Sequence, residues 1–376
     1  MKLIYLDNGA TTPVDKEVAK EMNSYLIDRY GNASSLHKKG REAKEALEKA
    51  REIIAKSVNA SKEEIIFTAS GTESNNLAIK GLVEAYPKKN HIITSKIEHP
   101  SILEVCKYLE KKGHKVDYIS VDKQGIVDLE EIKRKINAST LIVSVMHVNN
   151  EIGTIQPIEE IAKLCKGKCF FHTDAVQSFG KLDINVRNGI DLLSASAHKI
   201  NGPKGVGFLY IKKGIKISPL LQGGGQESKI RSSTENIPGI LAMARAVELI
   251  KKRDKEKIKK MRDKLLEKLL EIPESKLNGS KEKRIFNNIN VIFKNVEGES
   301  LVLMLDKFGV EASTGSACSS HSLKASHVLL SIGLGEEEAH GSLRLTLGWD
   351  FREEDIDYVA EKIKQAVEKL RSIYGR

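Results

Sequence analysis

The feature that most constrains the fold of this chain is a regular alternation of strand-like and helix-like segments over its first two thirds. Short apolar runs alternate with amphipathic stretches, and helices are expected to start near Thr72 and at Pro100. This succession predicts a mainly parallel sheet between two layers of helices. Because ligands of such sheets bind at the carboxyl ends of the strands, functional residues are expected there. The predicted strands cover residues 64–68, 91–94, 115–120, 141–145, 168–173, 191–194 and 205–211.

The last third of the chain predicts a second, smaller α/β domain. Residues 236–272 read as one long charged helix, and we place the domain boundary within it. Strands are expected at residues 286–293 and 343–347, before a final amphipathic helix. The apolar stripe of the long helix consists of Ile250, Ile258, Met261, Leu265 and Leu269. The predicted domains are residues 16–255 for the large one, and residues 1–15 with 256–376 for the small one.

Composition and charge narrow the classes of protein to which this chain can belong. With 376 residues, of which 40% are hydrophobic and 30% charged, the chain can form two sizeable cores. No segment approaches the roughly 20 consecutive apolar residues of a membrane span, and residues 1–7 are too short and too soon acidic for a signal peptide. We therefore expect a cytoplasmic protein without membrane contact. The net charge of +10 comes from basic residues interleaved with acidic ones, which disfavours direct nucleic-acid binding and leaves an acidic protein partner open.

The four cysteines form neither a disulfide framework nor a metal pattern. Cys106 falls in an amphipathic helix, where it is expected to pack. Cys165 is expected in a helix and Cys169 in the following strand, and no second pair completes a zinc site, so no resident metal is expected. Cys318 lies in a polar run of glycine, serine and threonine at residues 313–320. A thiol in such a loop has no core to fill, which indicates reactivity.

A lysine at the end of a predicted strand is the first candidate for catalysis. Lys199 follows the apolar run at residues 191–194 and precedes a glycine-rich turn at residues 202–207. A lysine that forms a Schiff base with an aldehyde cofactor needs a fixed position and a lowered pKa, and pyridoxal phosphate enzymes meet that need. An ordinary exposed lysine at the end of a strand would show the same local pattern.

Three further strand ends carry groups that suit a phosphorylated ring. The turn at residues 68–74 leads into a helix, and amides at a helix N-terminus suit a phosphate, although a plain capped helix also needs one such residue. Asp174 ends an apolar strand, where a protonated pyridine nitrogen would pair with its carboxylate; a helix N-cap is the alternative. His99 stands before a helix that begins with proline, so it could stack on a flat ring, move protons or serve the turn.

Two segments offer groups for a substrate carboxylate. Asn149 and Asn150 follow a strand, and their amides suit a carboxylate, a cofactor oxygen or the turn itself. Arg344 lies in an alternating strand, where bidentate binding of a carboxylate is its usual use, although a plain edge-strand arginine looks the same. Each of these candidate groups is weak evidence alone, but their order along the chain makes a shared site for cofactor and substrate a stronger prediction.

Taken together, these residues closely resemble the cysteine desulfurases of the NifS and IscS kind, in the class V aminotransferase group of fold type I pyridoxal phosphate enzymes. The match departs from the usual family pattern at residues 69–72, which read Ala-Ser-Gly-Thr, and at Ser233, which stands where glycine is usual before Thr234. The resemblance implies an α/β fold with a large domain and a smaller C-terminal domain. The matching segments are residues 5–13, 31–37, 71–81, 147–154, 174–178, 196–199, 223–227, 233–236 and 315–320.

The resemblance also implies a role for each matching residue. Lys199 would form the Schiff base with pyridoxal phosphate and move the substrate Cα proton, and Cys318 would take the sulfur. Asp174 would pair with the pyridinium nitrogen, Gln177 would donate to the ring hydroxyl, and His99 would stack on the ring. The remaining implied contacts are Gly71, Thr72, Ser196 and His198 to the phosphate, Thr234 to the phosphate across a homodimer interface, and Asn149 and Arg344 to the substrate carboxylate, with Asn149 also near the cofactor.

The activity implied is conversion of L-cysteine to L-alanine with transfer of the sulfur to Cys318 as a persulfide. The sulfur would supply an iron–sulfur scaffold protein or another acceptor, and Cys318 as a transient iron–sulfur ligand stays open. The loop that carries Cys318 is of the longer of two types found in the family, and in this it resembles relatives that supply sulfur to such scaffolds. The alternatives are a selenocysteine lyase, a plain aminotransferase, and a sulfur-trafficking protein whose catalytic residues are vestigial.

Overall fold

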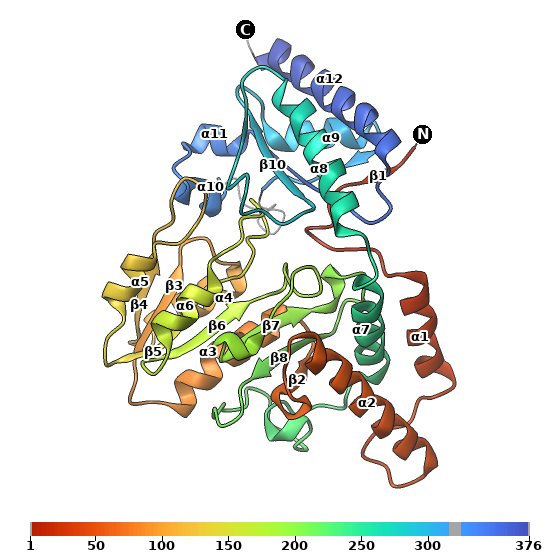
Figure 1. Cartoon of the computed structure of the whole chain (residues 1–376), viewed down its shortest axis with the longest axis vertical. Coiled ribbons are helices and arrows are strands. Elements are labelled where there is room, and N and C mark those ends of the chain that lie inside the picture. The colour runs from red at the N-terminus through yellow and green to blue at the C-terminus, as the bar shows by residue number, and fades with distance from the viewer. Residues whose placement is uncertain (1, 316–324, 375–376) are drawn as a thin grey trace.

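A sheet of seven strands forms the centre of the structure, a computed structural model that describes residues 2–315 and 325–374 (Figure 1). The strands are β2 (Ile65–Thr68), β3 (His91–Ser95), β4 (Lys115–Ile119), β5 (Thr140–Ser144), β6 (Phe170–Asp174), β7 (Leu192–Ser196) and β8 (Gly207–Ile211). They lie in the order β2–β8–β7–β6–β5–β3–β4. All neighbours from β7 to β4 are parallel, whereas β8 is antiparallel to both β7 and β2. The mainly parallel sheet that the alternation predicts is confirmed.

Helices cover both faces of this sheet because successive side chains of a strand point to opposite sides. Ile93 and Val143 belong to one core, which helices α2, α6 and α7 complete. Ile92 and Ile142 belong to the core on the other face, which α3 and α4 complete. The helices of this part are α1 (Lys16–Ile27), α2 (Lys38–Ser57), α3 (Gly71–Ala85), α4 (Pro100–Glu110), α5 (Leu129–Lys135), α6 (Ile158–Cys165) and α7 (Ile237–Ile250).

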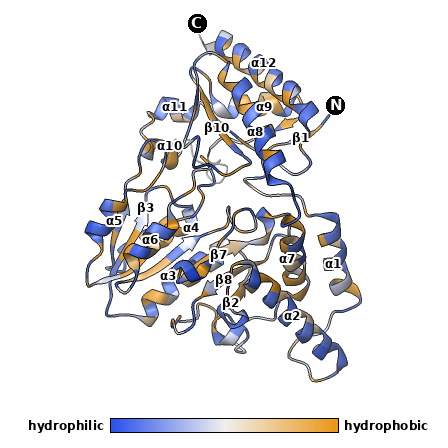
Figure 2. Ribbon diagram, viewed as in Figure 1, coloured by the Kyte–Doolittle hydropathy of each residue, from blue (hydrophilic) through white to orange (hydrophobic). Residues whose placement is uncertain are grey.

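A smaller α/β unit stands above the sheet in Figure 1. Its strands are β1 (Ile4–Tyr5), β9 (Ser275–Leu277), β10 (Asn288–Phe293), β11 (Val310–Glu311) and β12 (Ser342–Thr346), and its helices are α8 (Lys255–Leu270), α9 (Gly298–Asp306), α10 (His327–Ser331), α11 (Glu336–His340) and α12 (Ile356–Tyr374). Strands β12, β10 and β9 form an antiparallel sheet in that order, and β1 pairs with β11. Helix α12 is banded in Figure 2, as expected of a helix with one apolar face on a core.

The segment predicted as one long helix is two helices, so this prediction is wrong. Helix α7 ends at Ile250 and α8 begins at Lys255. The side chain of Asp254 caps α8, since it accepts a hydrogen bond from the backbone N–H of Lys257 at 3.0 Å. The charged run before this cap hides the break because it continues the polar pattern of both helices.

The two helices also belong to different cores. Ile250 packs in the core of the large sheet, whereas Ile258 and Met261 pack with the smaller unit. The N-terminal Ile4 and Leu6 lie in the core of the smaller unit as well. We therefore propose the division into residues 16–255 and residues 1–15 with 256–376. Among the described residues, no helix has the length and apolar character to cross a membrane.

Candidate active site

A cavity of about 300 Å³ lies where the carboxyl ends of the large sheet face the smaller unit. Strands β3, β6 and β7 end here, and β2 ends here too because it and β7 are both antiparallel to β8. Most of the residues singled out from the sequence line this one cavity, although they are far apart in the chain. These are Gly71, Thr72, His99, Asp174, Gln177, Ser196, His198, Lys199 and Arg344.

The first turn of α3 forms one wall of the cavity and leaves no space for a side chain. A Cβ atom at Gly71 would lie 2.5 Å from Cγ2 of Val176 and 3.8 Å from Cβ of Ser196. Ser70 caps the helix by accepting a hydrogen bond from the N–H of Glu73 at 3.2 Å. The backbone N–H groups at the start of α3 therefore face a cradle that suits a phosphate.

His198 lines the cavity two residues after Ser196. Its Nδ1 lies 3.2 Å from Oγ1 of Thr11. Burial and the nearby Lys199 lower the pKa of His198 to about 4. His198 is therefore neutral near pH 7, and it can offer a phosphate a hydrogen bond but no full positive charge.

Asp174, the last residue of β6, places a buried carboxylate in the cavity. Its side chain is held by Asn75, whose Nδ2 donates to Oδ2 at 2.7 Å, and by the N–H of Val176, which donates to Oδ1 at 2.9 Å. Both donors are neutral, and Asp174 is only 5% exposed. A pyridinium nitrogen would supply the positive charge that such a carboxylate favours.

His99 is the N-cap of α4 and lines the same cavity. Its Nδ1 accepts a hydrogen bond from the backbone N–H of Ser101 at 3.1 Å and lies 2.8 Å from the Ser101 Oγ. Burial lowers the pKa of His99, with a further decrease from the charge of Lys199 that Asp174 opposes. The neutral ring is suited to stack on a flat cofactor and to exchange a proton.

Lys199 follows β7 in the short turn η3 (Ala197–Lys199). Its Nζ donates hydrogen bonds to the carbonyl oxygens of Gly9 at 2.5 Å and of Ala10 at 2.6 Å. The Nε2 of Gln177 donates to the same Gly9 oxygen at 3.0 Å. The N-terminal segment therefore fixes the position of the lysine amine, which is a requirement for a nucleophile.

Arg344, in β12 of the smaller unit, is the cationic group at the other end of the cavity. It is 2% exposed, and its Nη2 forms an ion pair with Oδ1 of Asp7 at 2.7 Å. Its Nη1 donates to the Asn150 carbonyl at 3.3 Å, while Nε is buried with no hydrogen-bond partner among the described residues. A guanidinium with an unsatisfied buried N–H is suited to receive a carboxylate.

These residues fit pyridoxal phosphate, the cofactor that the sequence predicts. The cradle at Gly71 suits the phosphate of this cofactor, and the carboxylate of Asp174 suits its protonated ring nitrogen. The amine of Lys199 suits its aldehyde. The unpartnered Nε of Arg344 leaves a separate place for the carboxylate of a substrate amino acid. The whole set is a site for amino-acid chemistry on this cofactor.

Three of the predicted site residues are not among those that line this cavity. The side chain of Asn149 serves its own turn, since its Oδ1 accepts from the N–H groups of Glu151 and Ile152 and its Nδ2 donates to the carbonyl of Ile97. Thr234 is exposed outside the cavity. Cys318 lies outside the described residues. Their roles stay predictions.

Sequence reasoning missed several residues that contact the predicted ones. Asn75 holds Asp174, Ser101 contacts His99, and Asp7 pairs with Arg344. Asn75 stands one helical turn after Gly71, so its position on the wall of the cavity was available as a signal. For Asp7 no comparable signal exists, because its partner lies 337 residues away.

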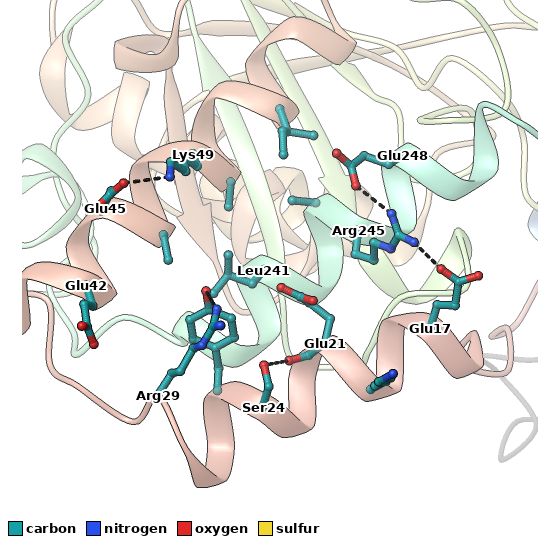
Figure 3. Close-up of a pocket in the computed structure, with 16 residues that line it drawn as sticks. Glu17, Glu21, Ser24, Arg29, Glu42, Glu45, Lys49, Leu241, Arg245 and Glu248 are labelled. Carbon is teal, nitrogen blue, oxygen red and sulfur yellow. Dashed lines mark hydrogen bonds and ion pairs between the residues drawn. The ribbon is translucent and has the colours of Figure 1, made fainter. Parts of the chain in front are cut away.

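A larger hollow of about 1010 Å³ lies between α1, α2 and α7, away from these residues. Figure 3 shows that its charged side chains meet one another, with Arg245 between Glu17 and Glu248 and Lys49 beside Glu45. None of the residues predicted from the sequence lines it. We therefore assign the chemistry to the smaller cavity.

Comparison with known proteins places this site in a family. The model of the family described as aminotransferase class-V matches residues 4–359. A curated relative, "Cysteine desulfurase IscS" of Dictyoglomus turgidum, is 51% identical over 377 residues, which are 98% of this chain and 96% of that protein. A solved structure described as "NifS-like protein" superposes with a TM-score of 0.93 at 40% identity, covering 98% of this chain and all of that one. Another, described as "SspA in complex with cysteine", has a TM-score of 0.83 at 38% identity and covers 92% of this chain and 98% of that one. With a match over nearly its whole length, this chain belongs to the aminotransferase class-V family.

Proposed function

We propose that this chain is a cysteine desulfurase, which converts L-cysteine to L-alanine and transfers the sulfur to Cys318 as a persulfide. Its cofactor is pyridoxal phosphate, as its family indicates. The observation that carries the proposal is the meeting of Lys199, Asp174 and Arg344 in one cavity of a chain that is 51% identical to a protein named cysteine desulfurase. The relative that was solved with cysteine supports the choice of substrate.

When it is bound, pyridoxal phosphate supplies an aldehyde for the substrate amine and a ring that draws electrons from the substrate Cα. In the proposed arrangement, Asp174 would pair with the ring nitrogen and the start of α3 would hold the phosphate. Arg344 binds the substrate carboxylate through Nε and one Nη group, which fixes the orientation of the Cα–H bond. The amine of Lys199 then moves the Cα proton, and the neutral imidazole of His99 would lie against the ring with its Nε2–H free to donate a hydrogen bond.

The sulfur leaves as the Cβ–S bond of L-cysteine breaks and an S–S bond forms at Cys318. The thiolate of Cys318 is the nucleophile in this step, and Cβ gains a proton when L-alanine is formed. A selenocysteine lyase would need the thiol less, and an aminotransferase would have no use for it. Cys318 therefore separates the proposed activity from both alternatives.

The decisive experiment incubates the purified protein with L-cysteine and measures L-alanine, sulfide and the mass of the peptide that contains Cys318. We expect alanine formation together with a Cys318 peptide heavier by one sulfur atom. Cys318→Ala should abolish both, whereas the control Cys169→Ala, at the opposite end of β6 from Asp174, should keep both. Undiminished alanine and sulfide production by Cys318→Ala would rule out the persulfide route.

A second measurement tests the cofactor site. The wild-type protein should show the visible absorbance band of a Schiff base between pyridoxal phosphate and a lysine, and Lys199→Ala should lack it. A protein that shows no such band, and no alanine formation, would instead be a sulfur-trafficking protein with vestigial catalytic residues.

We also propose a homodimer in which Thr234 reaches the phosphate site of the partner subunit. Its exposed position outside its own cavity supports this placement. Sedimentation analysis should give twice the mass of one chain. Mixing the inactive variants Thr234→Val and Lys199→Ala should restore part of the activity, because a mixed dimer would contain one complete site; no restoration would refute the shared site.

For the destination of the sulfur, we propose an iron–sulfur scaffold protein or another sulfur acceptor. This proposal follows the name of the curated relatives and can be tested by transfer of labelled sulfur from Cys318 to a purified scaffold. We further propose that the enzyme works in the cytoplasm, which the free thiols of Cys106, Cys165 and Cys169 support. Cell fractionation measures this directly.

A further inference from the structure

A chain of buried hydrogen bonds joins two residues that the proposed function places on different sides of the cofactor. Asn75 donates through Nδ2 to Oδ2 of Asp174 at 2.7 Å and to Oγ of Ser101 at 2.8 Å. Ser101 Oγ lies 2.8 Å from Nδ1 of His99. Asn75 is 1% exposed and Ser101 is 8% exposed, so water does not replace these bonds easily.

The direction of these bonds follows from the chemistry of the partners. The carboxylate of Asp174 can only accept, so the Asn75 atom that faces it is the amide nitrogen. One hydrogen of that nitrogen serves Asp174 and the other serves the oxygen of Ser101. The hydroxyl hydrogen of Ser101 is thereby left to point toward Nδ1 of His99.

The same bonds decide which nitrogen of His99 carries the proton. The backbone N–H of Ser101 donates to Nδ1 at 3.1 Å, and a backbone N–H cannot accept. Nδ1 is therefore an acceptor, and the proton of the neutral ring is on Nε2. Nε2 of the neutral ring is accordingly a hydrogen-bond donor, while Nδ1 is occupied by the donors of Ser101.

We propose that Asn75 and Ser101 are positioning residues that lock the orientation of Asp174 and the orientation and tautomer of His99 as one unit. The inference rests on the proposed function, because it concerns the groups that hold the cofactor ring there. Asp174 at the ring nitrogen and His99 against the ring must keep a fixed relation to each other. A network with one shared amide, that of Asn75, provides this relation.

The test is a double-mutant cycle on the enzyme loaded with pyridoxal phosphate. The variants are Asn75→Ala, Ser101→Ala, the double variant and the control Asn76→Ala. Asn76 neighbours Asn75 on α3, but it is only half-buried, and its side chain bonds only the Thr72 carbonyl among the described residues. Each variant is measured for pyridoxal phosphate affinity, for the pH dependence of the visible absorbance band, and for kcat and KM with L-cysteine.

We expect Asn75→Ala to lower kcat/KM about tenfold, since hydrogen bonds to charged groups contribute at that scale. It should also weaken cofactor binding about tenfold and shift the pH profile of the band, because Asp174 loses its orienting donor. Ser101→Ala should lower kcat by a similar factor with little change in cofactor affinity. The double variant should resemble Asn75→Ala, because both changes cut one network.

Two results would overturn the inference. Multiplied effects in the double variant, about a hundredfold in kcat/KM, would mean that the residues act independently. Unchanged cofactor affinity and band profile in a folded Asn75→Ala would mean that Asn75 only packs. If Asn75→Ala does not fold, Asn75→Ser gives the same comparison with a shorter donor. A wild-type protein that neither binds the cofactor nor releases alanine would refute the proposed function instead, so the two failures are distinguishable.

Discussion

Replacement of Gly9 by alanine tests whether the N-terminal segment sets the geometry of the site. Gly9 lies in the wall of the cavity, and its carbonyl receives hydrogen bonds from Lys199 and Gln177. A Cβ atom at this position would lie 2.7 Å from Oγ1 of Thr346, 3.3 Å from Nε of Arg344 and 3.4 Å from Cζ of Arg344. Gly9 has no positive φ, so the loss would come from space alone and not from backbone strain.

The size of the effect follows from these distances. A contact of 2.7 Å between a Cβ and an oxygen must lengthen by a few tenths of an ångström, and the guanidinium of Arg344, at 3.3–3.4 Å from the same Cβ, must give way as well. A misplacement of 1 Å can cost about 100-fold in rate, so a shift of this size predicts a loss of roughly tenfold in kcat/KM. Crowding of the well-packed site adds a decrease of about 1–3 kcal/mol in the free energy of unfolding.

The assay is the initial rate of alanine formation over a range of L-cysteine concentrations, with cofactor content measured by absorbance. We expect a higher KM for Gly9→Ala, because the binding place of the substrate carboxylate is displaced. The matched control is Gly335→Ala, where an added Cβ meets no atom within 4 Å and φ is −69°. A Gly9→Ala enzyme with unchanged kcat and KM would refute the assignment of Arg344 and the N-terminal segment to the substrate site.

Three further predictions concern binding, stability and pH. Arg344→Lys should raise the KM for L-cysteine at least about tenfold with little effect on cofactor content, because lysine cannot bind a carboxylate in a bidentate manner. Steady-state kinetics measure the KM, and an unchanged KM would contradict this prediction. Glu227→Gln should lower the free energy of unfolding by about 3 kcal/mol in denaturant titrations. It removes the buried partner of Arg51, now paired at 2.7 and 2.8 Å, and leaves only the more exposed Glu48 at 3.3 Å as a counter-charge. The exposed pair of Lys49 and Glu45 is the control, and a loss as small as that of Glu45→Gln would be the contrary result. Burial raises the pKa of Glu98 from 4.5 to about 8. Between pH 4.5 and about pH 8 the folded chain therefore keeps a proton that the unfolded chain releases. The free energy of unfolding should fall in this range by up to about 1.4 kcal/mol per pH unit. Glu98→Gln should make this slope less negative in unfolding experiments across that range, although Glu151, whose pKa burial raises to about 7, keeps its own contribution. An unchanged slope would show that the carboxyl of Glu98 ionises normally.

Much of the site could be predicted because single strand ends carry their own chemical signal. Lys199, Asp174 and His99 each follow a predicted strand, and parallel strands bring their carboxyl ends to one edge, so the order of the motifs already implied that these residues meet. The break between α7 and α8 was missed for a local reason. The charged residues before Asp254 continue the polar face of a helix, and periodicity does not register an N-cap in such a run.

The sequence by itself determined the alternation of elements, the mainly parallel sheet and the choice of candidate reactive groups, because these depend on local pattern and residue chemistry. Only the tertiary structure decided how the groups are held. The pairing of Asp7 with Arg344 and the bonds from Asn75 to Asp174 and Ser101 join segments that are far apart in the chain. It also showed that the amide of Asn149 serves its own turn. A hydrogen bond depends on distances of a few tenths of an ångström, and packing of the whole chain sets these distances, whereas the sequence around either partner does not.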